Sequence, residues 1–312
     1  MSVQLMPIEG PVAYSDEWYQ ARKKTIGASE AAACLGMSGF AQPLDVFLSK
    51  KSDDGGKNGK MNDAMQRGKD FEPICLMLYG RNLGGTLHTE VPMLIHPDYP
   101  FMSATPDALW SGDNIGKLDW SYNLDYIPVE AKTTEMFDGW GSEGTDEIPP
   151  CYIIQSQQHM AVTGKERCDV PVLNGFNYKL YHVHRDQEII DTLVSVESEM
   201  IERVANDDPP EINWEHPKTP ELVTRMHKVT EKDMALPAEF CEKWLEMETL
   251  KSNAREMTKQ ASKLKAEVEN EMAGHGIARM MDGREIVRKV EKRSGYEVGP
   301  KEFITMRARK IK

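Results

Sequence analysis

Hydrophobic spacing changes from the helical period to the strand period and back along the first two thirds of the chain. The helical period covers 16–33, with a break at Gly27, and 64–79. Short strand-prone runs at 91–95, 101–109 and 126–133 follow, and we expect adjacent strands there. A helix at 152–162, two strands within 169–183 and an amphipathic helix at 186–204 complete the order. The pattern predicts an α/β fold with a central mixed sheet flanked by helices.

The C-terminal third follows other patterns. Prolines among acidic and polar residues at 206–220 predict a linker, or an arm laid over the first domain. Apolar residues recur at spacings of three and four within 238–274, which predicts a long helix whose apolar seam either forms a coiled coil or packs on the core. Turn residues predict a small β-hairpin at 277–290. The predicted domains are a core at 1–205, the linker or arm, and a helical extension with a hairpin at 221–312.

Composition limits the classes of protein. No window approaches the roughly 18 apolar residues of a membrane helix, and the N-terminus lacks the regions of a secretion signal, so we expect a cytoplasmic protein with no membrane partner. The five cysteines lie far apart, which argues against disulfides or a thiolate metal site. A net charge of −12 does not exclude DNA binding, because a basic strip along the phosphate backbone is sufficient for it. The basic runs at 22–24, 50–51 and 301–312 fit either such a strip or an ordinary solvated surface.

The sharpest chemical feature is Pro106-Asp107 followed by Glu130-Ala131-Lys132. Alternate residues of a strand share a face, so Glu130 and Lys132 point one way, Ala131 points the other, and Asp107 on a neighbouring run can meet them. Two converging carboxylates suit Mg²⁺ or Mn²⁺, and the carbonyl of Ala131 offers a further oxygen. A metal ion beside a lysine can activate water for phosphodiester hydrolysis. The alternative is ordinary surface charge on an exposed strand.

Five segments together resemble the phage-type recombination nucleases of the lambda exonuclease and YqaJ family, within the PD-(D/E)XK class. In the family's order they are TIGASEAAA at 25–33, RGKDFEP at 67–73, SATPDA at 103–108, VEAKT at 129–133 and PCYIIQSQQHMAVTG at 150–164. The resemblance covers about residues 14–185 and implies a restriction-endonuclease-like core. An insert at 111–125 departs from the family pattern, and it either shapes a DNA channel or lengthens a hairpin.

The resemblance implies roles for the matching acidic residues. Asp107 and Glu130 match the metal ligands, and Lys132 matches the catalytic lysine. Glu72 matches a helix acid that approaches a second metal. With the carbonyl of Ala131, these residues form the expected metal site.

The resemblance also assigns supporting residues. Gln157 matches a glutamine that supports the site, although Gln155 points to a different helical face and only one of the two can contact the site directly. His159 shares the face of Gln155, and we expect it to pack rather than to catalyse. Arg22 and Ser29 match residues that hold the terminal 5′ phosphate of DNA, which suits a guanidinium and a hydroxyl near a helix N-terminus. The alternative for this pair is a helix salt bridge and a cap.

The resemblance further implies a Mg²⁺- or Mn²⁺-dependent 5′ to 3′ exonuclease that acts on double-stranded DNA ends and leaves single strands for phage-type recombination in a bacterial host. A ring-shaped homo-oligomer and a single-strand annealing protein as partner are implied by the same likeness. Two alternatives stay open. One is another PD-(D/E)XK nuclease, either an endonuclease or a Cas4-like enzyme, which would need four cysteines on an iron–sulfur cluster. The other is a non-catalytic DNA-end-binding or scaffold protein.

Overall fold

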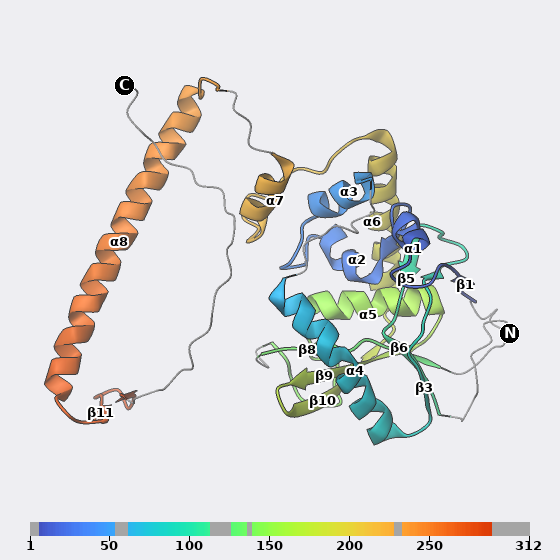
Figure 1. The fold of residues 1–312 in the computed structure, drawn as a ribbon, viewed down its shortest axis with the longest axis horizontal. Helices are drawn as coiled ribbons and strands as arrows, with labels where there is room; N and C mark the ends of the chain where they lie inside the picture. The colour runs from blue at the N-terminus through green and yellow to red at the C-terminus, as the bar shows by residue number, and fades with distance from the viewer. Residues whose placement is uncertain (1–5, 54–61, 113–125, 136–138, 228–232, 289–312) are drawn as a thin grey trace. The chain divides into compact units, whose positions relative to one another are not determined.

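The computed structural model describes residues 6–53, 62–112, 126–135, 139–227 and 233–288, and the chain divides into two compact units, Met1–Val229 and Thr230–Lys312 (Figure 1). Most of the insert at 111–125 and all of the basic run at 301–312 lie outside the described residues. The unit boundary falls later than the predicted one at residue 221. The reason is α7 (Thr219–Met226), whose Leu222 is fully buried in a cluster of the first unit.

A mixed sheet of six strands forms the centre of the first unit. β7 and β8 run parallel to β9, and the other neighbours are antiparallel. β9 and β10 form the predicted hairpin, with Gly175 at its turn at φ +56°. The strand order is β10 (Asn177–His184), β9 (Arg167–Asn174), β7 (Ile127–Val129), β6 (Ala108–Ser111) and β3 (Thr86–His88), with β8 (Lys132–Thr133) also on β9.

A second sheet has the order β1 (Ile8–Glu9), β4 (Leu94–Ile95), β5 (Met102–Ala104) and β2 (Ile26–Gly27). The expectation of adjacent strands at 91–95, 101–109 and 126–133 is therefore only partly right, because the run 101–109 divides between the two sheets. Pro106 lies at this division and has no N–H with which to continue a ladder. The connection from β5 to β6 carries Asp107.

Helices cover both faces of the large sheet. On one face, Met160 of α5 (Pro150–Thr163) packs in a cluster with Val170 and other residues of β9 and β10. On the opposite face, Tyr79 of α4 (Asp63–Leu83) packs in a cluster with Val129. Figure 1 shows α4 and α5 crossing the strands in different directions. Both helices were predicted from the hydrophobic periodicity. α4 continues past Gly80, beyond its predicted end at residue 79, to a C-cap at Gly84.

Four further helices complete the first unit. They are α1 (Asp16–Arg22), α2 (Ala28–Cys34), α3 (Pro43–Lys51) and α6 (Gln187–Asn206). The predicted helix at 16–33 is interrupted by β2, as Gly27 indicated, and the small side chains of α2, such as the fully buried Ala31, let it pack closely on α5 and α6. α3 was not predicted; its apolar residues Leu44 and Phe47 share a cluster with Met200 of α6.

The described part of the second unit contains α8 (Ala238–Met272) and the hairpin of β11 (Ile277–Arg279) and β12 (Glu285–Val287). The long helix and the small hairpin were both predicted. Seam residues of α8, including Leu250 and Leu264, are exposed. Within the described residues, no helix is long and apolar enough to cross a membrane. The chain thus has the predicted mixed α/β core, flanking helices, C-terminal helix and hairpin.

Candidate active site

The strand that carries Glu130 is interrupted at its centre. β7 ends at Val129 and β8 begins at Lys132, yet both pair with β9 in one continuous register, Val129 opposite Asp169 and Lys132 opposite Val172. The N–H of Glu130 still donates to the carbonyl of Asp169 at 2.9 Å. The N–H of the next residue, Ala131, instead donates to a side chain.

Asp107 accepts that hydrogen bond. The N–H of Ala131 lies 2.8 Å from Oδ2 of Asp107, and the pairing of Ala108 with Val129 brings Asp107 beside Glu130. The side chain of Ala131 packs with the α4 cluster on the opposite face of the sheet. The structure therefore brings Asp107, Glu130 and Lys132 together. Glu130 and Lys132 face one side of the sheet and Ala131 faces the other, as the alternation along a strand predicts.

Both carboxylate oxygens of Glu130 are hydrogen-bonded. Oε1 accepts from Nζ of Lys132 and from Nε2 of Gln155, each at 2.6 Å, and Oε2 lies 2.8 Å from Nε2 of His159. Burial by itself would raise the pKa of Glu130, but Lys132 and then His159 outweigh burial and lower this pKa to about 2. Glu130 is therefore a buried carboxylate held in its charged form.

Gln155, not Gln157, is the glutamine on this carboxylate. Nε2 of Gln157 donates to the carbonyl of His184 at 2.7 Å, and Oε1 of Gln157 accepts from the N–H of Asp186 at 2.9 Å. Gln157 thus joins α5 to the end of β10 and the start of α6. The match to Gln157 was wrong in its placement, because residues two apart on a helix face different directions.

His159 was expected to pack rather than to act at the site. It is buried and four residues after Gln155, and this helical spacing brings both side chains to Glu130. The spacing was visible in the sequence. The partner shared by the two side chains was not, because Glu130 lies on another element.

Glu72 of α4 shares a cavity of about 260 Å³ with Asp107 and Glu130. Burial, then Glu130 and Glu72, raise the pKa of Asp107 well above its usual value. Burial and then Glu130 raise the pKa of Glu72 as well. The side chains that line the cavity include Tyr14, Trp18, Arg22, Ser29, Thr105, Gln155 and His159.

This set of oxygens fits a hard divalent cation such as Mg²⁺ or Mn²⁺. Asp107, Glu130 and Glu72 place excess negative charge in one partly enclosed cavity, and a bound cation would relieve their mutual repulsion. Among the residues that the structure describes, no three His, Cys, Asp or Glu side chains already form a metal centre. Glu130 is turned to Lys132 and His159 instead.

Arg22 and Ser29 lie on the same cavity, as the 5′-phosphate prediction requires. Arg22 is also held by Glu30, with 3.0 Å between the guanidinium and Oε1. Glu30 in turn binds Lys50 at 2.6 Å, and Lys50 is only 4% exposed. Lys50 is therefore a buried structural cation rather than part of a basic surface strip. The exposed Ser29 lies in the first turn of α2.

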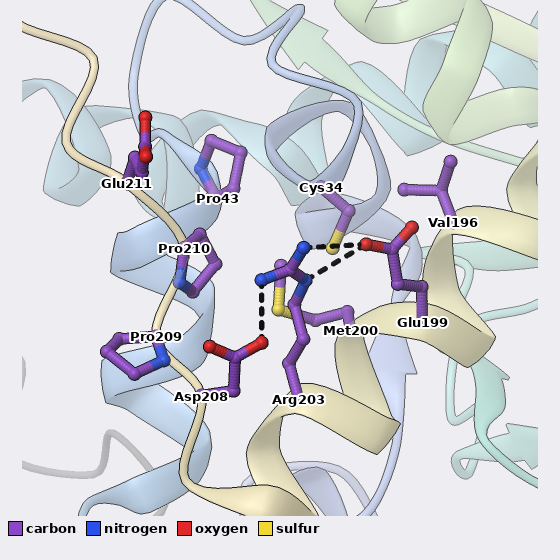
Figure 2. A pocket seen from close by; sticks show the side chains of 10 residues that line it. All are labelled: Cys34, Pro43, Val196, Glu199, Met200, Arg203, Asp208, Pro209, Pro210 and Glu211. Carbon is purple, nitrogen blue, oxygen red and sulfur yellow. Dashed lines mark hydrogen bonds and ion pairs between the residues drawn. The ribbon is translucent and has the colours of Figure 1, made fainter.

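A larger pocket of about 530 Å³ lies elsewhere in the first unit, between α6 and residues 208–211 (Figure 2). Three of its polar residues are paired with one another, because Arg203 bridges Glu199 and Asp208 at 2.9 Å each. The remaining wall is largely apolar, with Val196 and Met200 among its residues. No residue of the predicted site lines this pocket, so the smaller cavity is the better candidate.

Sequence comparison agrees with the motif resemblance. Residues 17–166 match the YqaJ-like viral recombinase domain family. The chain is also 26% identical over 265 residues to a Bacillus subtilis (strain 168) protein named "Uncharacterized protein YqaJ", a similarity that covers 82% of this chain and 78% of that protein. The predicted resemblance to this family is confirmed.

The solved structures that are similar to this chain include two exonucleases. An alkaline exonuclease from Laribacter hongkongensis has a TM-score of 0.48 and 23% identity, covering 62% of this chain and 94% of that one. A phage-related exonuclease from Haemophilus somnus 129PT has a TM-score of 0.41 and 15% identity, covering 59% and 96%.

Proposed function

We propose, on the premise that residues 17–166 form a YqaJ-like viral recombinase domain, that this protein is a metal-dependent deoxyribonuclease. In this proposal it degrades linear double-stranded DNA from its ends, 5′ to 3′, and leaves single strands for recombination. The observation that carries the proposal is the grouping of Asp107 and Glu130 on one cavity, with the ammonium of Lys132 bonded to Glu130. A protein that only bound DNA ends would have no need of all three groups.

Asp107 and Glu130 would hold Mg²⁺ or Mn²⁺, with the carbonyl of Ala131 and the carboxylate of Glu72 as further oxygen donors. A bound divalent ion would lower the pKa of a coordinated water and stabilise charge on the phosphate. Gln155 and His159 fix the orientation of Glu130, because each contacts one of its oxygens. This proposal keeps a supporting glutamine but gives the role to Gln155 in place of Gln157.

Lys132 would orient the attacking water and offset negative charge at the phosphate. Burial by itself would lower its pKa, but Glu130 and then Asp107 outweigh burial and raise it, so the ammonium stays protonated. The charge of this ammonium would act electrostatically on the phosphate, which is the usual way in which fixed charges lower the barrier to phosphodiester cleavage.

Arg22 and Ser29 would hold the terminal 5′ phosphate, which sets the direction of digestion. Both line the cavity, and Arg22 is oriented by Glu30 and by the Trp18 ring, whose centroid lies 4.7 Å from the guanidinium carbon. A preoriented guanidinium binds a phosphate with less loss of side-chain entropy than a free one. We also keep as proposals a ring-shaped homo-oligomer and a single-strand annealing partner.

The test is digestion of linear and closed-circular duplex DNA with Mg²⁺ or with EDTA. We expect loss of the linear substrate alone, only with Mg²⁺, and faster with a 5′ phosphate than with a 5′ hydroxyl. Lys132→Ala should abolish digestion, and Lys251→Ala, on the exposed surface of α8, should not. Cutting of circles would favour an endonuclease. DNA binding without any cleavage would favour an end-binding protein.

A further inference from the structure

Two aromatic rings and two cations alternate in a row beside the carboxylate cavity, and three of the four, Tyr14, Trp18 and Arg22, line it. The Lys69 ammonium lies 4.2 Å from the centroid of the Tyr14 ring, and the rings of Tyr14 and Trp18 are 5.2 Å apart. The Arg22 guanidinium follows over Trp18. We call these four residues the aromatic–cation row. Alternating rings and cations are how proteins hold single-stranded nucleic acid, with rings for bases and cations for phosphates.

Tyr14 is the most available ring of the row. It is 59% exposed, although it lines the cavity. Its backbone is left-handed, at φ +64°, a conformation that is uncommon for residues other than glycine. The turn is fixed by Ser15, whose N–H donates to the carbonyl of Val12 and whose hydroxyl caps α1. Since this turn would be less strained with glycine, the tyrosine is explained by its ring and not by its backbone.

The electrostatics of Tyr14 suit contact with a DNA strand. Partial burial raises its pKa, and Glu72, Asp107 and Glu130 raise it further, so the phenol stays neutral beside the carboxylates. A neutral ring does not repel the phosphates of an incoming strand. Lys69 precedes Glu72 by three residues on α4 and so lies on the same helical face. The row therefore ends beside the carboxylates.

We propose that Tyr14 stacks on a nucleobase at the end of the DNA strand whose phosphate reaches the carboxylates. Lys69 then leaves the ring for a backbone phosphate of the same strand, which its flexible four-carbon side chain allows. The inference rests on the proposed nuclease function and specifies the state of its substrate. A base can stack on a protein ring only after it leaves its neighbour in the duplex, so the enzyme holds an opened end.

Stacking on Tyr14 does not select a sequence, because every base presents an aromatic face. The row therefore accounts for an end-specific nuclease that reads no base identity. It also predicts that the protein binds a short single strand when the terminal base is present and binds it less tightly when that base is missing.

Binding of short 5′-phosphorylated single strands to the full-length protein tests the proposal, measured by fluorescence anisotropy with Ca²⁺ in place of Mg²⁺. The strands carry a terminal base or an abasic terminal sugar. We expect Tyr14→Ala to weaken binding of the complete strand roughly tenfold, within the range for loss of one base–aromatic stack. The abasic strand should bind the wild type as weakly as the complete strand binds Tyr14→Ala, and Tyr14→Ala should show no difference between the strands.

Three further variants keep the test decisive. Tyr14→Phe retains the ring and should bind like the wild type. Tyr14→Gly relieves the backbone strain and should bind like Tyr14→Ala, which separates loss of the ring from misfolding. Lys69→Gln should reduce the salt dependence of binding by about one phosphate contact, whereas Lys251→Gln should not.

Equal losses for the two strands in Tyr14→Ala, or no loss at all, would overturn the stacking proposal. In that case cleavage by the wild type and its loss in Lys132→Ala would leave the nuclease proposal standing. If the wild type binds no DNA strand and cleaves none, the proposed function fails together with this inference.

Discussion

Nε2 of His159 lies 2.8 Å from Oε2 of Glu130, and this histidine is 1% exposed. A buried carboxylate is stable only when its oxygens are hydrogen-bonded, so His159 supports the charge on Glu130. We expect His159→Leu to lower kcat roughly 10- to 100-fold, the effect of losing one hydrogen bond to a charged group. His227→Leu, at an exposed position, is the control. An unchanged kcat in a folded His159→Leu protein would contradict this role.

Gln155 and Gln157 should give opposite results when each is replaced by alanine. Gln155→Ala removes a 2.6 Å contact to Glu130 and should lower kcat roughly tenfold or more at nearly unchanged stability. Gln157→Ala leaves a carbonyl and an N–H at the β10–α6 junction without their partner and should cost about 1–3 kcal/mol of unfolding free energy. Kinetics and chemical denaturation of both variants test the pair, and the reverse pattern would restore Gln157 to the site.

Glu30 should make stability depend on pH in the acid range. Burial alone would raise its pKa, but Lys50 and then Arg22 lower it to about 2 from an ordinary 4.5. A carboxyl whose pKa falls on folding stabilises the folded state above its ordinary pKa, and this contribution is lost as the pH falls from about 4.5 to about 2. Glu30→Gln should cost about 3 kcal/mol near neutral pH, because Lys50 stays buried without its charge partner.

The stability cost of Glu30→Gln should shrink as the pH falls, because the wild-type carboxyl is then also neutral. Denaturant titrations between about pH 7 and pH 2 measure the difference between the two proteins, with the exposed Glu202→Gln as the control. A cost that stays constant over this range would show that the charge of Glu30 is not what Lys50 requires.

Asp107→Asn should stabilise the metal-free protein while removing its response to metal. Burial, Glu130 and Glu72 all disfavour the charged form of Asp107, so a neutral amide removes a repulsion. We expect Tm to rise by about 2–4 °C without metal, typical of relieving strain at a functional site. Mg²⁺ should raise the Tm of the wild type but not of Asp107→Asn, as calorimetry can measure. Asp191→Asn is the control. An equal rise in Tm with Mg²⁺ for Asp107→Asn and Asp191→Asn would show that the metal binds elsewhere.

The exposed seam of α8 makes the proposed homo-oligomer testable. Leu250 and Leu264 are 61% and 62% exposed, and apolar seams of this spacing are typical of helices that pair. Light scattering of the full chain should give a mass above that of one chain, and Leu264→Glu should reduce that mass. A monomeric wild type would remove the ring from the proposal.

Local patterns predicted most of the fold. The helical periodicity predicted α4, α5, α6 and α8, and the Asn174-Gly175 pair predicted the β9–β10 turn. The division of 101–109 between two sheets was not predicted, because strand propensity does not say which neighbour a strand will pair with. Pro106 was the available sign of that division.

The site was predictable where its spacing is local and not where distant elements meet. Glu130 and Lys132 share a face because they are two apart on a strand, and the sequence alone implies this. The choice between Gln155 and Gln157 depends on how α5 is rotated against the sheet, which no local pattern encodes. The contact of Lys50 with Glu30, twenty residues apart, is likewise tertiary. Of the basic pair at 50–51, Lys50 is therefore buried and only Lys51 is exposed.

The continuous register across the β7–β8 interruption restricts the length of this strand as well as its residues. One inserted or deleted residue between Val129 and Lys132 would reverse the facing of every later side chain. Lys132 would then point toward α4, and Glu130 would lose its ammonium partner. A substitution at this site therefore changes one side chain and leaves the facing of its neighbours unchanged. An insertion or deletion removes the carboxylate–lysine pair even if every residue type is kept.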